Sequence, residues 1–299
     1  MERVNITFLG TGNAIPTEIR NHTGILLRFK DESLLFDCGE GIQRQFRLAK
    51  LSPSKLTRIF ITHWHGDHIL GLPGLFQTLA MSNYSQTLKI YGPVGTKKFI
   101  SLIIELLMHI NIKIEVHEMH DSAIIDAGEF KIEAKSMAHG TPTLAYSFII
   151  KEKIRLRKDK LKKLKLPNSP LLKKLQEGKD IIIKNKKIKA SQVTYKQPGK
   201  KITVILDTAM NNKAIELAKN SDLVITESTF SEHEAEKAKE YKHLTAKDAA
   251  TIAKKSNSKA LIITHISQRY EHNLSRIENE AKRTFKNTRV AKDLDSLEL

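Results

Sequence analysis

The alternation of apolar and polar positions predicts many short strands and few helices. In the first half of the chain, alternating or apolar runs predict one helix near 96–109 and strands at 4–9, 24–29, 33–37, 57–62, 88–91, 112–117, 123–125, 129–137 and 144–150. In the second half, the same patterns predict helices near 245–255 and 273–285 and strands at 202–206, 223–226 and 260–264. The periodicity alone therefore indicates an α/β protein with two strand-rich halves and no internal repeat.

Length and cysteine content narrow the class of protein. At 299 residues the chain fits one core domain that carries an insertion. The apolar run at 99–108 is shorter than the roughly 18 residues that a membrane-spanning helix needs, so it predicts a buried helix. Cys38 is the only cysteine, which excludes a disulfide within the chain, and no apolar secretory segment precedes the first strand. We expect a cytoplasmic protein that does not enter a membrane.

One segment carries almost all of the excess positive charge. The chain has 50 Lys and Arg against 33 Asp and Glu, a formal net charge of +17. Residues 151–201 hold 19 of the basic and 4 of the acidic residues, a net of +15, whereas all other residues together carry only +2. This segment separates the two strand-rich halves. A charge of this size favours polyanionic partners such as nucleic acid.

The basic segment allows two interpretations. It is either a solvated surface insertion without a partner or a protruding arm that binds phosphates. In its first part, the leucines Leu156, Leu161, Leu164 and Leu166 are too few to predict a separately packed domain. Tyr195 is its only aromatic residue, which argues against base stacking and favours recognition of the backbone or shape of a folded RNA.

A cluster of potential metal ligands follows the strand predicted at 57–62. His63, His65, Asp67 and His68 place three imidazoles and one carboxylate within six residues. Imidazole nitrogen and carboxylate oxygen suit a divalent ion such as Zn²⁺. One catalytic zinc site needs only three protein ligands, so this cluster, together with ligands from elsewhere in the chain, predicts two ions.

Three further candidate ligands stand where later strands end. They are His139, Asp207 and His265. Taken singly, each of them is more typical of a residue that caps a strand end through hydrogen bonds. Together with the first cluster they favour a shared site. A carboxylate such as Asp207 could bridge two ions roughly 3.5–4 Å apart, as in two-metal hydrolysis.

Several motifs give a narrower resemblance. The chain resembles the short form of ribonuclease Z, a family within the metallo-β-lactamase superfamily, at residues 8–17, 36–45, 62–68, 243–246, 264–270 and 285–294. The resemblance extends from residue 1 to about 295, and it implies a four-layer αββα sandwich over residues 1–299. It further implies that residues 151–201 are an inserted arm that binds tRNA.

The resemblance also implies roles for individual residues. His63, His65 and His139 would bind one zinc ion, Asp67, His68 and His265 a second, and Asp207 would bridge the two. Asp67 would also accept a proton from the attacking water. His243 matches the family's histidine that is not a ligand, and it would act as a general acid or stabilise the transition state. Alternatively, it is only a neighbour of the helix N-cap at Thr245.

Other positions match the family less completely. The family has a tetrapeptide motif that begins with a histidine followed by a glutamate, and in this chain the two positions are Thr226 and Glu227. Glu227 either orients an imidazole or pairs with a lysine. The residues expected to contact RNA are Arg20 and Asn21 in a loop near the first strand, and Pro170, Lys173 and Lys174 in the arm. Two departures from the family pattern stand beside them. Ser169 replaces the usual glycine, and Glu18 replaces the usual lysine, so we expect altered discrimination against CCA ends.

The sequence thus predicts a zinc-dependent endoribonuclease with two ions per subunit. It would cut precursor tRNA immediately 3′ of the acceptor stem, leaving a 3′-hydroxyl on the tRNA and a 5′-phosphate on the trailer. The family resemblance also implies a homodimer in which the arm of one subunit serves the centre of the other. Two alternatives stay open: another phosphodiesterase on the same scaffold, and a noncatalytic RNA-binding protein with structural zinc.

Overall fold

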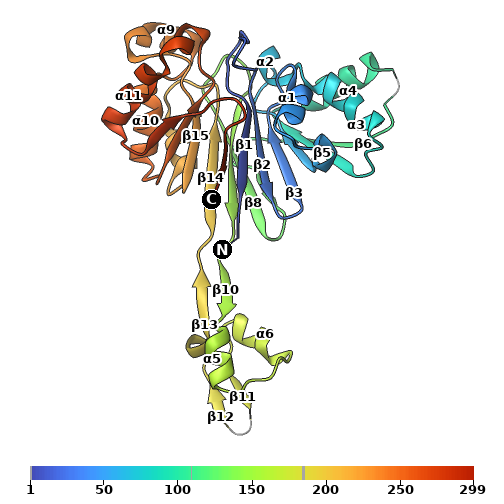
Figure 1. Cartoon of the computed structure of the whole chain (residues 1–299), viewed down its shortest axis with the longest axis vertical. Coiled ribbons are helices and arrows are strands. Elements are labelled where there is room, and N and C mark those ends of the chain that lie inside the picture. The colour runs from blue at the N-terminus through green and yellow to red at the C-terminus, as the bar shows by residue number, and fades with distance from the viewer. Residues whose placement is uncertain (1, 109, 184–185) are drawn as a thin grey trace.

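The chain folds into two sheets packed face to face, with helices on both outer faces and an arm that projects from one end (Figure 1). The computed structural model describes residues 2–108, 110–183 and 186–299. The order of layers is helix, sheet, sheet, helix. This confirms the αββα sandwich that the sequence predicts.

The first sheet comes mainly from the first third of the chain. Its strand order is β18-β1-β2-β3-β4-β5-β6. The strands are β1 (Asn5–Gly10), β2 (Gly24–Phe29), β3 (Glu32–Phe36), β4 (Arg58–Phe60), β5 (Thr87–Gly92), β6 (Lys113–Glu118) and β18 (Ser296–Glu298). Its outer face is covered by α1 (Ile42–Leu48), α3 (Leu72–Met81) and α4 (Thr96–Leu106).

The second sheet has the order β17-β16-β15-β14-β9-β8-β7. Its strands are β7 (Ile124–Asp126), β8 (Phe130–Ser136), β9 (Leu144–Ile150), β14 (Lys200–Ile205), β15 (Leu223–Glu227), β16 (Leu261–Thr264) and β17 (Thr288–Val290). The helices on this side of the sandwich are α8 (Asn212–Ala218), α9 (Ala235–Tyr241), α10 (Ala246–Lys255) and α11 (Leu274–Thr284).

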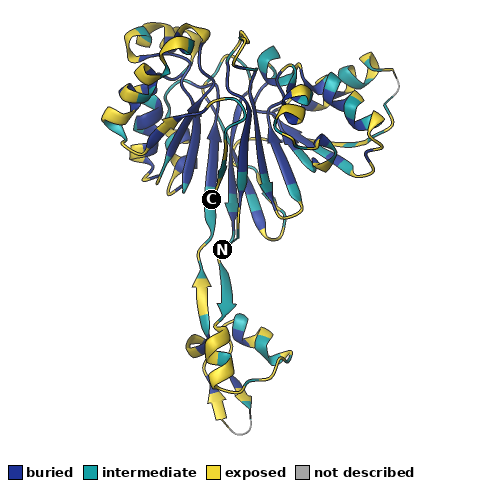
Figure 2. Cartoon of the chain, in the orientation of Figure 1, coloured by how far each residue is buried: buried dark blue, intermediate teal, exposed yellow. Residues whose placement is uncertain are grey.

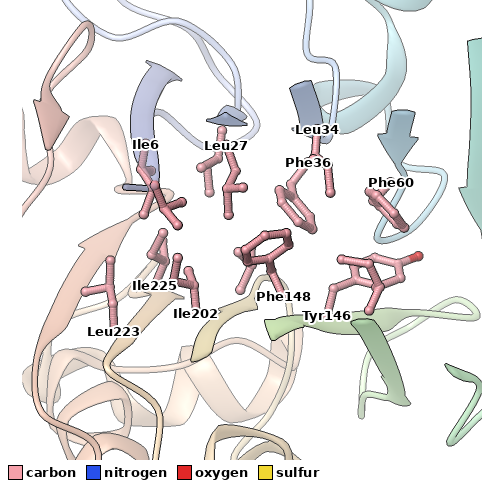
Figure 3. Packing of buried hydrophobic residues seen from close by; sticks show 14 of the residues in the cluster. Ile6, Leu27, Leu34, Phe36, Phe60, Tyr146, Phe148, Ile202, Leu223 and Ile225 are labelled. Atoms are coloured by element: carbon pink, nitrogen blue, oxygen red, sulfur yellow. The ribbon is translucent and has the colours of Figure 1, made fainter. Parts of the chain in front are cut away.

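The largest hydrophobic cluster fills the space between the sheets (Figure 3). Leu27 and Phe36 from the first sheet face Phe148 and Ile225 from the second, and all four side chains are at most 1% exposed. Two further clusters lie between each sheet and its helices. Because both faces of the central strands are covered, these strands are buried along their length (Figure 2).

Every strand that the sequence predicts is present, with ends displaced by at most two residues. The pattern missed the short helices α1, α3, α8 and α9. One prediction is wrong: α4 is not buried, since Phe99, Leu102 and Leu106 are 39%, 50% and 72% exposed. This helix packs through Ile100 on the sheet and leaves its other apolar side open. No helix within the described residues is long and apolar enough to cross a membrane.

The arm leaves the sandwich after β9 and returns at β14, so it spans 151–199, two residues less than predicted. Its stalk pairs β10 (Lys153–Leu156) with β13 (Thr194–Gln197). Its head consists of α5 (Lys158–Lys163), α6 (Leu171–Gln176), β11 (Ile181–Ile183), β12 (Lys186–Ile188) and α7 (Ala190–Val193).

The head has a small core of its own, which the sequence analysis did not expect. Leu175 and Val193 are fully buried, and Ile181 and Ile188 are 4% and 7% exposed. The earlier count considered only the leucines up to residue 166. The isoleucines and the valine that follow them in the sequence supply the missing apolar surface.

Ion pairs join the stalk to the sandwich. The Lys153 ammonium lies 3.0 Å from Glu2 and 2.6 Å from Glu129, and Arg155 lies 2.9 Å from Glu2. Lys30 in the β2–β3 turn also pairs with Glu129 and lies 3.6 Å from Glu2. We call these five residues the stalk cluster. Its carboxylates belong to the body, and two of its cations belong to the arm.

Candidate metal centre

All seven predicted ligands lie at one end of the sandwich, where strands of both sheets finish. His63 follows β4, and α2 (Gly66–Ile69) begins directly after His65 and carries Asp67 and His68. The three distant ligands stand on loops after later strands: His139 after β8, Asp207 after β14 and His265 after β16. Because β14 starts at the arm and ends at Asp207, the centre and the arm lie at opposite ends of this strand.

One group of ligands surrounds the Oδ2 atom of Asp207. His63 Nε2 lies 3.6 Å from this oxygen and His139 Nε2 lies 3.8 Å from it. The Nδ1 atom of His65 is 2.9 Å from His63 Nε2 and 3.3 Å from His139 Nε2. His65 is exposed, so this side of the group opens to solvent.

A second group surrounds the other oxygen of the same carboxylate. Asp207 Oδ1 lies 3.4 Å from His68 Nε2 and 3.2 Å from His265 Nε2. The two imidazole nitrogens are 3.2 Å apart, and Asp67 Oδ2 is 3.3 Å from each. Asp207 therefore faces both groups, one with each oxygen.

These separations fit metal binding. Ligands at 2.0–2.1 Å from a tetrahedral zinc ion lie ~3.3–3.4 Å from one another. The ligand atoms of His63, His65, His139 and Asp207 all lie within 4.8 Å of one another, and so do those of Asp67, His68 and His265. Asp207, His243 and His265 form a third set at the same spacing. In addition, Asp207 Oδ1 is buried without a hydrogen-bond partner, a costly arrangement that a bound cation would relieve. The residues present thus suit one cation per group.

The ring nitrogens that point away from the centre have partners of their own. His68 Nδ1 lies 2.7 Å from the buried carboxylate of Asp37, which also accepts hydrogen bonds from the Thr62 backbone and hydroxyl. Thr62 Oγ1 is in turn 3.0 Å from His63 Nδ1. On the opposite side, Thr229 Oγ1 is 2.9 Å from His265 Nδ1. Such contacts fix the orientation of the rings.

The sequence analysis assigned no role to Asp37 or Thr229. Asp37 stands in the segment 36–45 that was matched to the family, directly after a strand, and this position was the only available signal. The partner of His139 could not be predicted at all, because its Nδ1 lies 3.1 Å from the backbone carbonyl of Lys242. Every residue has a backbone carbonyl, so the residue types in the sequence do not indicate which carbonyl His139 contacts.

The backbone at the centre is strained. Asp207 has φ 25° and His265 has φ 54°, in the left-handed region that residues other than glycine rarely adopt. Asp37, with φ 57°, shares this feature. Strain of about 1–3 kcal/mol per residue persists only where the surrounding structure enforces it, and such residues gather at functional sites.

The charges of the site residues suit a cation. Burial raises the pKa of Asp207, but the imidazoles of His265, His68 and His63 outweigh it and hold the pKa well below the usual range. The pKa of Asp67 is lowered too, because His68 and His265 outweigh its burial. Burial and the neighbouring His68 lower the pKa of His63, which leaves a neutral ring able to bind metal.

His243 lies beside the ligands and is held by Glu227. Its Nδ1 is 2.9 Å from Glu227 Oε1 and 3.9 Å from Asp207 Oδ2. Burial lowers the pKa of His243, but the Glu227 carboxylate more than offsets this and raises it to about 9. Thr245 caps α10, so His243 does stand two residues before a helix N-cap, but its ring is also held beside the ligand groups by Glu227.

Glu227 is fully buried and its hydrogen bonds are satisfied without a lysine. Besides His243, its Oε1 accepts from the Thr208 backbone at 2.8 Å. Its Oε2 accepts from the Thr229 hydroxyl at 2.7 Å, the same hydroxyl that lies beside His265. The paired-lysine alternative therefore does not hold. One carboxylate links the rings of His243 and His265.

The structure corrects the expected contact of Arg20 with RNA. Its side chain is 2% exposed and donates to Thr11 Oγ1 at 2.5 Å and to the Ala291 carbonyl at 3.1 Å. The neighbouring Asn21 is half-buried and donates to the Glu40 carbonyl at 2.7 Å. Both side chains hold the loop in place. In the arm, Pro170, Lys173 and Lys174 are exposed at the start of α6 or within it, at the far end of the molecule from the centre.

Known proteins are similar to this chain over nearly its full length. The ribonuclease Z of Nanoarchaeum equitans is 40% identical over 294 residues, which make up 98% of this chain and 92% of that protein. The ribonuclease Z of Methanothermobacter thermautotrophicus is 38% identical over 99% of this chain and 97% of its own. The chain belongs to the ribonuclease Z family.

Solved structures agree with membership of the ribonuclease Z family. Human tRNase Z, short form, superimposes with a TM-score of 0.72 at 30% identity over 98% of both chains. YhfI from Bacillus subtilis, described as a metallo-β-lactamase fold protein, gives a TM-score of 0.73 at 19% identity, which shows the fold alone. The chain is therefore a ribonuclease, a phosphodiester hydrolase, on the metallo-β-lactamase fold.

A second family model matches part of the chain. The model described as anti-Pycsar protein Apyc1 matches residues 4–197, and over this stretch the chain belongs to that family as well. The matched stretch contains His63 and His139 but ends before Asp207, His243 and His265. The ribonuclease Z relatives cover these three residues too.

Proposed function

We propose that this ribonuclease cleaves precursor tRNA immediately 3′ of the acceptor stem. One observation carries the proposal: six potential ligands lie in two groups beside the two oxygens of a seventh, Asp207, in a chain that matches ribonucleases Z along nearly its whole length. The products would be a tRNA with a 3′-hydroxyl and a trailer with a 5′-phosphate.

The ligands are assigned to two zinc ions per subunit. His63, His65 and His139 would hold one ion, and Asp67, His68 and His265 the other, with Asp207 between them. Nitrogen and carboxylate donors without a thiolate fit zinc. When bound, the two cations would lower the pKa of a water molecule and neutralise charge on the scissile phosphate.

Two side chains would transfer the protons of the reaction. Asp67, kept ionised by His68 and His265, would accept the proton of the attacking water. His243, kept protonated by Glu227, would donate to the departing 3′-oxygen of the tRNA. Glu227 takes no part in the chemistry itself, and it orients His243.

The arm would hold the tRNA, and its direction favours a homodimer. Lys200 at the end of the stalk is seven residues from Asp207 along an extended strand, or about 23 Å, and the arm extends further away. RNA held by the head therefore reaches the centre of a partner subunit more readily than that of its own. The open apolar side of α4, with Phe99, Leu102 and Leu106, would bury surface against a second copy of the chain.

The decisive experiment incubates the zinc-loaded protein with a 5′-labelled precursor tRNA and maps both new ends. We expect one cut 3′ of the acceptor stem, a 3′-hydroxyl and a 5′-phosphate. A precursor with an encoded CCA, run in parallel, tests whether Glu18 alters the discrimination. Hydrolysis of a small phosphodiester without cleavage of the precursor would favour the alternative phosphodiesterase. Sedimentation of the same sample measures the oligomeric state.

A further inference from the structure

A basic hollow lies on the outer side of the first sheet, at the end nearest the arm. Its volume is about 410 Å³, and it is lined by Arg3, Asn5, Arg28, Lys30, Asp31, Ser33, Lys55 and Gln86. Four of these side chains are cationic and one is acidic. The metal centre is at the opposite end of the sandwich, so this hollow is separate from it.

The strand pattern explains why the hollow exists. On β2, Leu27 and Phe29 face the other sheet, whereas Leu26 and Arg28 face the helical layer. Leu26 is covered by that layer, whereas Arg28, two residues further along the strand, is only half-buried and lines the hollow together with Lys55 of the turn at 53–55. Its cross-strand neighbours are Asn5 of β1 and Ser33 of β3.

Arg28 has no anionic partner. Within the described ranges no carboxylate lies within 4.0 Å of its guanidinium, and its Nε is buried without a hydrogen-bond acceptor. By contrast, Arg58, also at the edge of this sheet, forms a bidentate contact with Glu32 at 2.7 and 3.1 Å. A buried N–H group of a cation left without an acceptor is costly. The two terminal amino groups of Arg28 also have no hydrogen-bond partner within the described residues, and they are not buried, so they are the groups that can bind an anion from outside the chain.

The other cations around the hollow are only partly neutralised. Arg3 pairs with Glu298 at 3.3 Å, and Lys30 belongs to the stalk cluster. In the part of the chain that the structure describes, Lys55 has no carboxylate within ion-pair distance. Asp31 likewise has no basic side chain within that distance. The hollow thus offers two unpaired cations.

We propose that this hollow binds a phosphate group, with Arg28 as its principal ligand and Lys55 as a second. A guanidinium presents several N–H donors in one plane, which matches the oxygens of a phosphate. The favoured source is the backbone of the RNA substrate. Lys30 connects the lining of the hollow to Glu2 and Glu129, which hold Lys153 of the arm, so the hollow lies close to the base of the arm.

The assignment to RNA rests on the proposed function, whereas phosphate binding does not. The first experiment follows the Nε–H resonance of Arg28 by NMR in the zinc-loaded protein while inorganic phosphate is added, with Arg28→Gln to assign the signal. We expect a saturable shift that Lys55→Gln weakens and that Arg289→Gln, at an exposed position on β17 of the other sheet, leaves unchanged. A linear drift without saturation would overturn the proposal.

The second experiment identifies the source of the phosphate. Binding of a trailer-free tRNA, which cannot be cut, is measured by anisotropy at a series of salt concentrations. Each lost phosphate contact lowers the slope of log K against log[salt] by about 0.9, so we expect a reduction of about one for Arg28→Gln and none for Arg289→Gln. Unchanged slopes with saturable phosphate binding would support the site and assign it to a free phosphate compound.

Cleavage of precursor tRNA by the unmodified protein is recorded alongside both measurements. If it fails, the proposed function fails, but the phosphate titration still decides the site. A loss of thermal stability in Arg28→Gln with an unchanged salt slope for RNA, together with no saturable phosphate shift in the unmodified protein, would show that Arg28 only supports the sheet.

Discussion

The sandwich and the arm differ in the residues they present: buried potential metal ligands in the sandwich and exposed lysines in the arm. In the sandwich, ligands such as His63 and Asp207 are almost fully buried and are fixed by outer hydrogen bonds and enclosing strands. In the arm, a small core carries exposed lysines, and residues 151–201 hold a net charge of +15 against +2 elsewhere. Metal binding depends on ångström-scale positions, whereas attraction to a polyanion depends mainly on the number and sign of charges.

The strongest test of this comparison removes the carboxylate that both ligand groups share. Asp207→Ala should lose bound zinc and reduce hydrolysis of both precursor tRNA and a small phosphodiester to background, because neither group keeps its fourth donor. Affinity for tRNA should change little, since the arm is intact. Metal analysis, both activity assays and tRNA binding check this. Retention of two equivalents of zinc would contradict the bridging assignment.

The second test removes the arm and keeps the centre. Ile150 and Lys200 are paired neighbours on antiparallel strands, so an Asn-Gly turn can replace residues 151–199 without disturbing the sheet. Cleavage of precursor tRNA should fall on the order of 10²–10³-fold, since the phosphate contacts are lost. Hydrolysis of a small phosphodiester and zinc content should stay the same. Equal loss of both activities would mean that the arm supports the fold instead of the substrate.

The two regions also differ in how far sequence predicts them. The ligands were identifiable because each stands at a strand end, and four of them lie within six residues. The outer partners were not, since the carbonyl of Lys242 and the hydroxyl of Thr229 are found only once distant segments meet. The burial of Arg20 depends on Ala291, which is 271 positions away. Chain-local patterns contain no such information.

In the arm, the charge was predictable and the packing was not. Counting lysines located the insertion to within two residues of its end. Its core escaped notice because Leu175, Ile181 and Val193 are spread over short elements with no clear period. The exposed side of α4 was misjudged for a related reason: an apolar run alone does not distinguish a side that packs on the sheet from one that is left open.

A smaller effect within the sandwich is expected from Glu227→Gln. The amide keeps the shape of the side chain but removes the charge that orients His243, so kcat on precursor tRNA should fall about 10–100-fold. The carboxylate raises the pKa of His243 to about 9, and in the proposed mechanism the protonated ring is the acid. Activity is therefore lost as pH rises through this pKa. Glu227→Gln should move this alkaline fall of the pH–rate profile to lower pH. Rate profiles between about pH 6 and 10 measure the shift.

A double variant separates orientation from a merely structural role of Glu227. If Glu227 acts through His243, Glu227→Gln should add little to the loss already caused by His243→Asn. Thermal unfolding and zinc content serve as controls. Multiplicative losses in the double variant would mean that Glu227 acts by another route, such as its hydroxyl contact with Thr229 beside His265.

The smallest effect is expected where the two regions meet, at the stalk cluster. Glu129→Gln removes one carboxylate that holds Lys153 and Lys30, and exposed ion pairs are individually weak. We expect a few-fold lower kcat/KM on precursor tRNA at low salt, no change on a small phosphodiester, and no difference at high salt, where the pair is screened. Because Lys153 and Lys30 lower the pKa of Glu129 to about 2, the pair stays charged down to that pH, and the difference should not vary between about pH 6 and 9. A difference that persists at high salt would show that Glu129 contributes packing or a direct RNA contact instead of setting the direction of the arm.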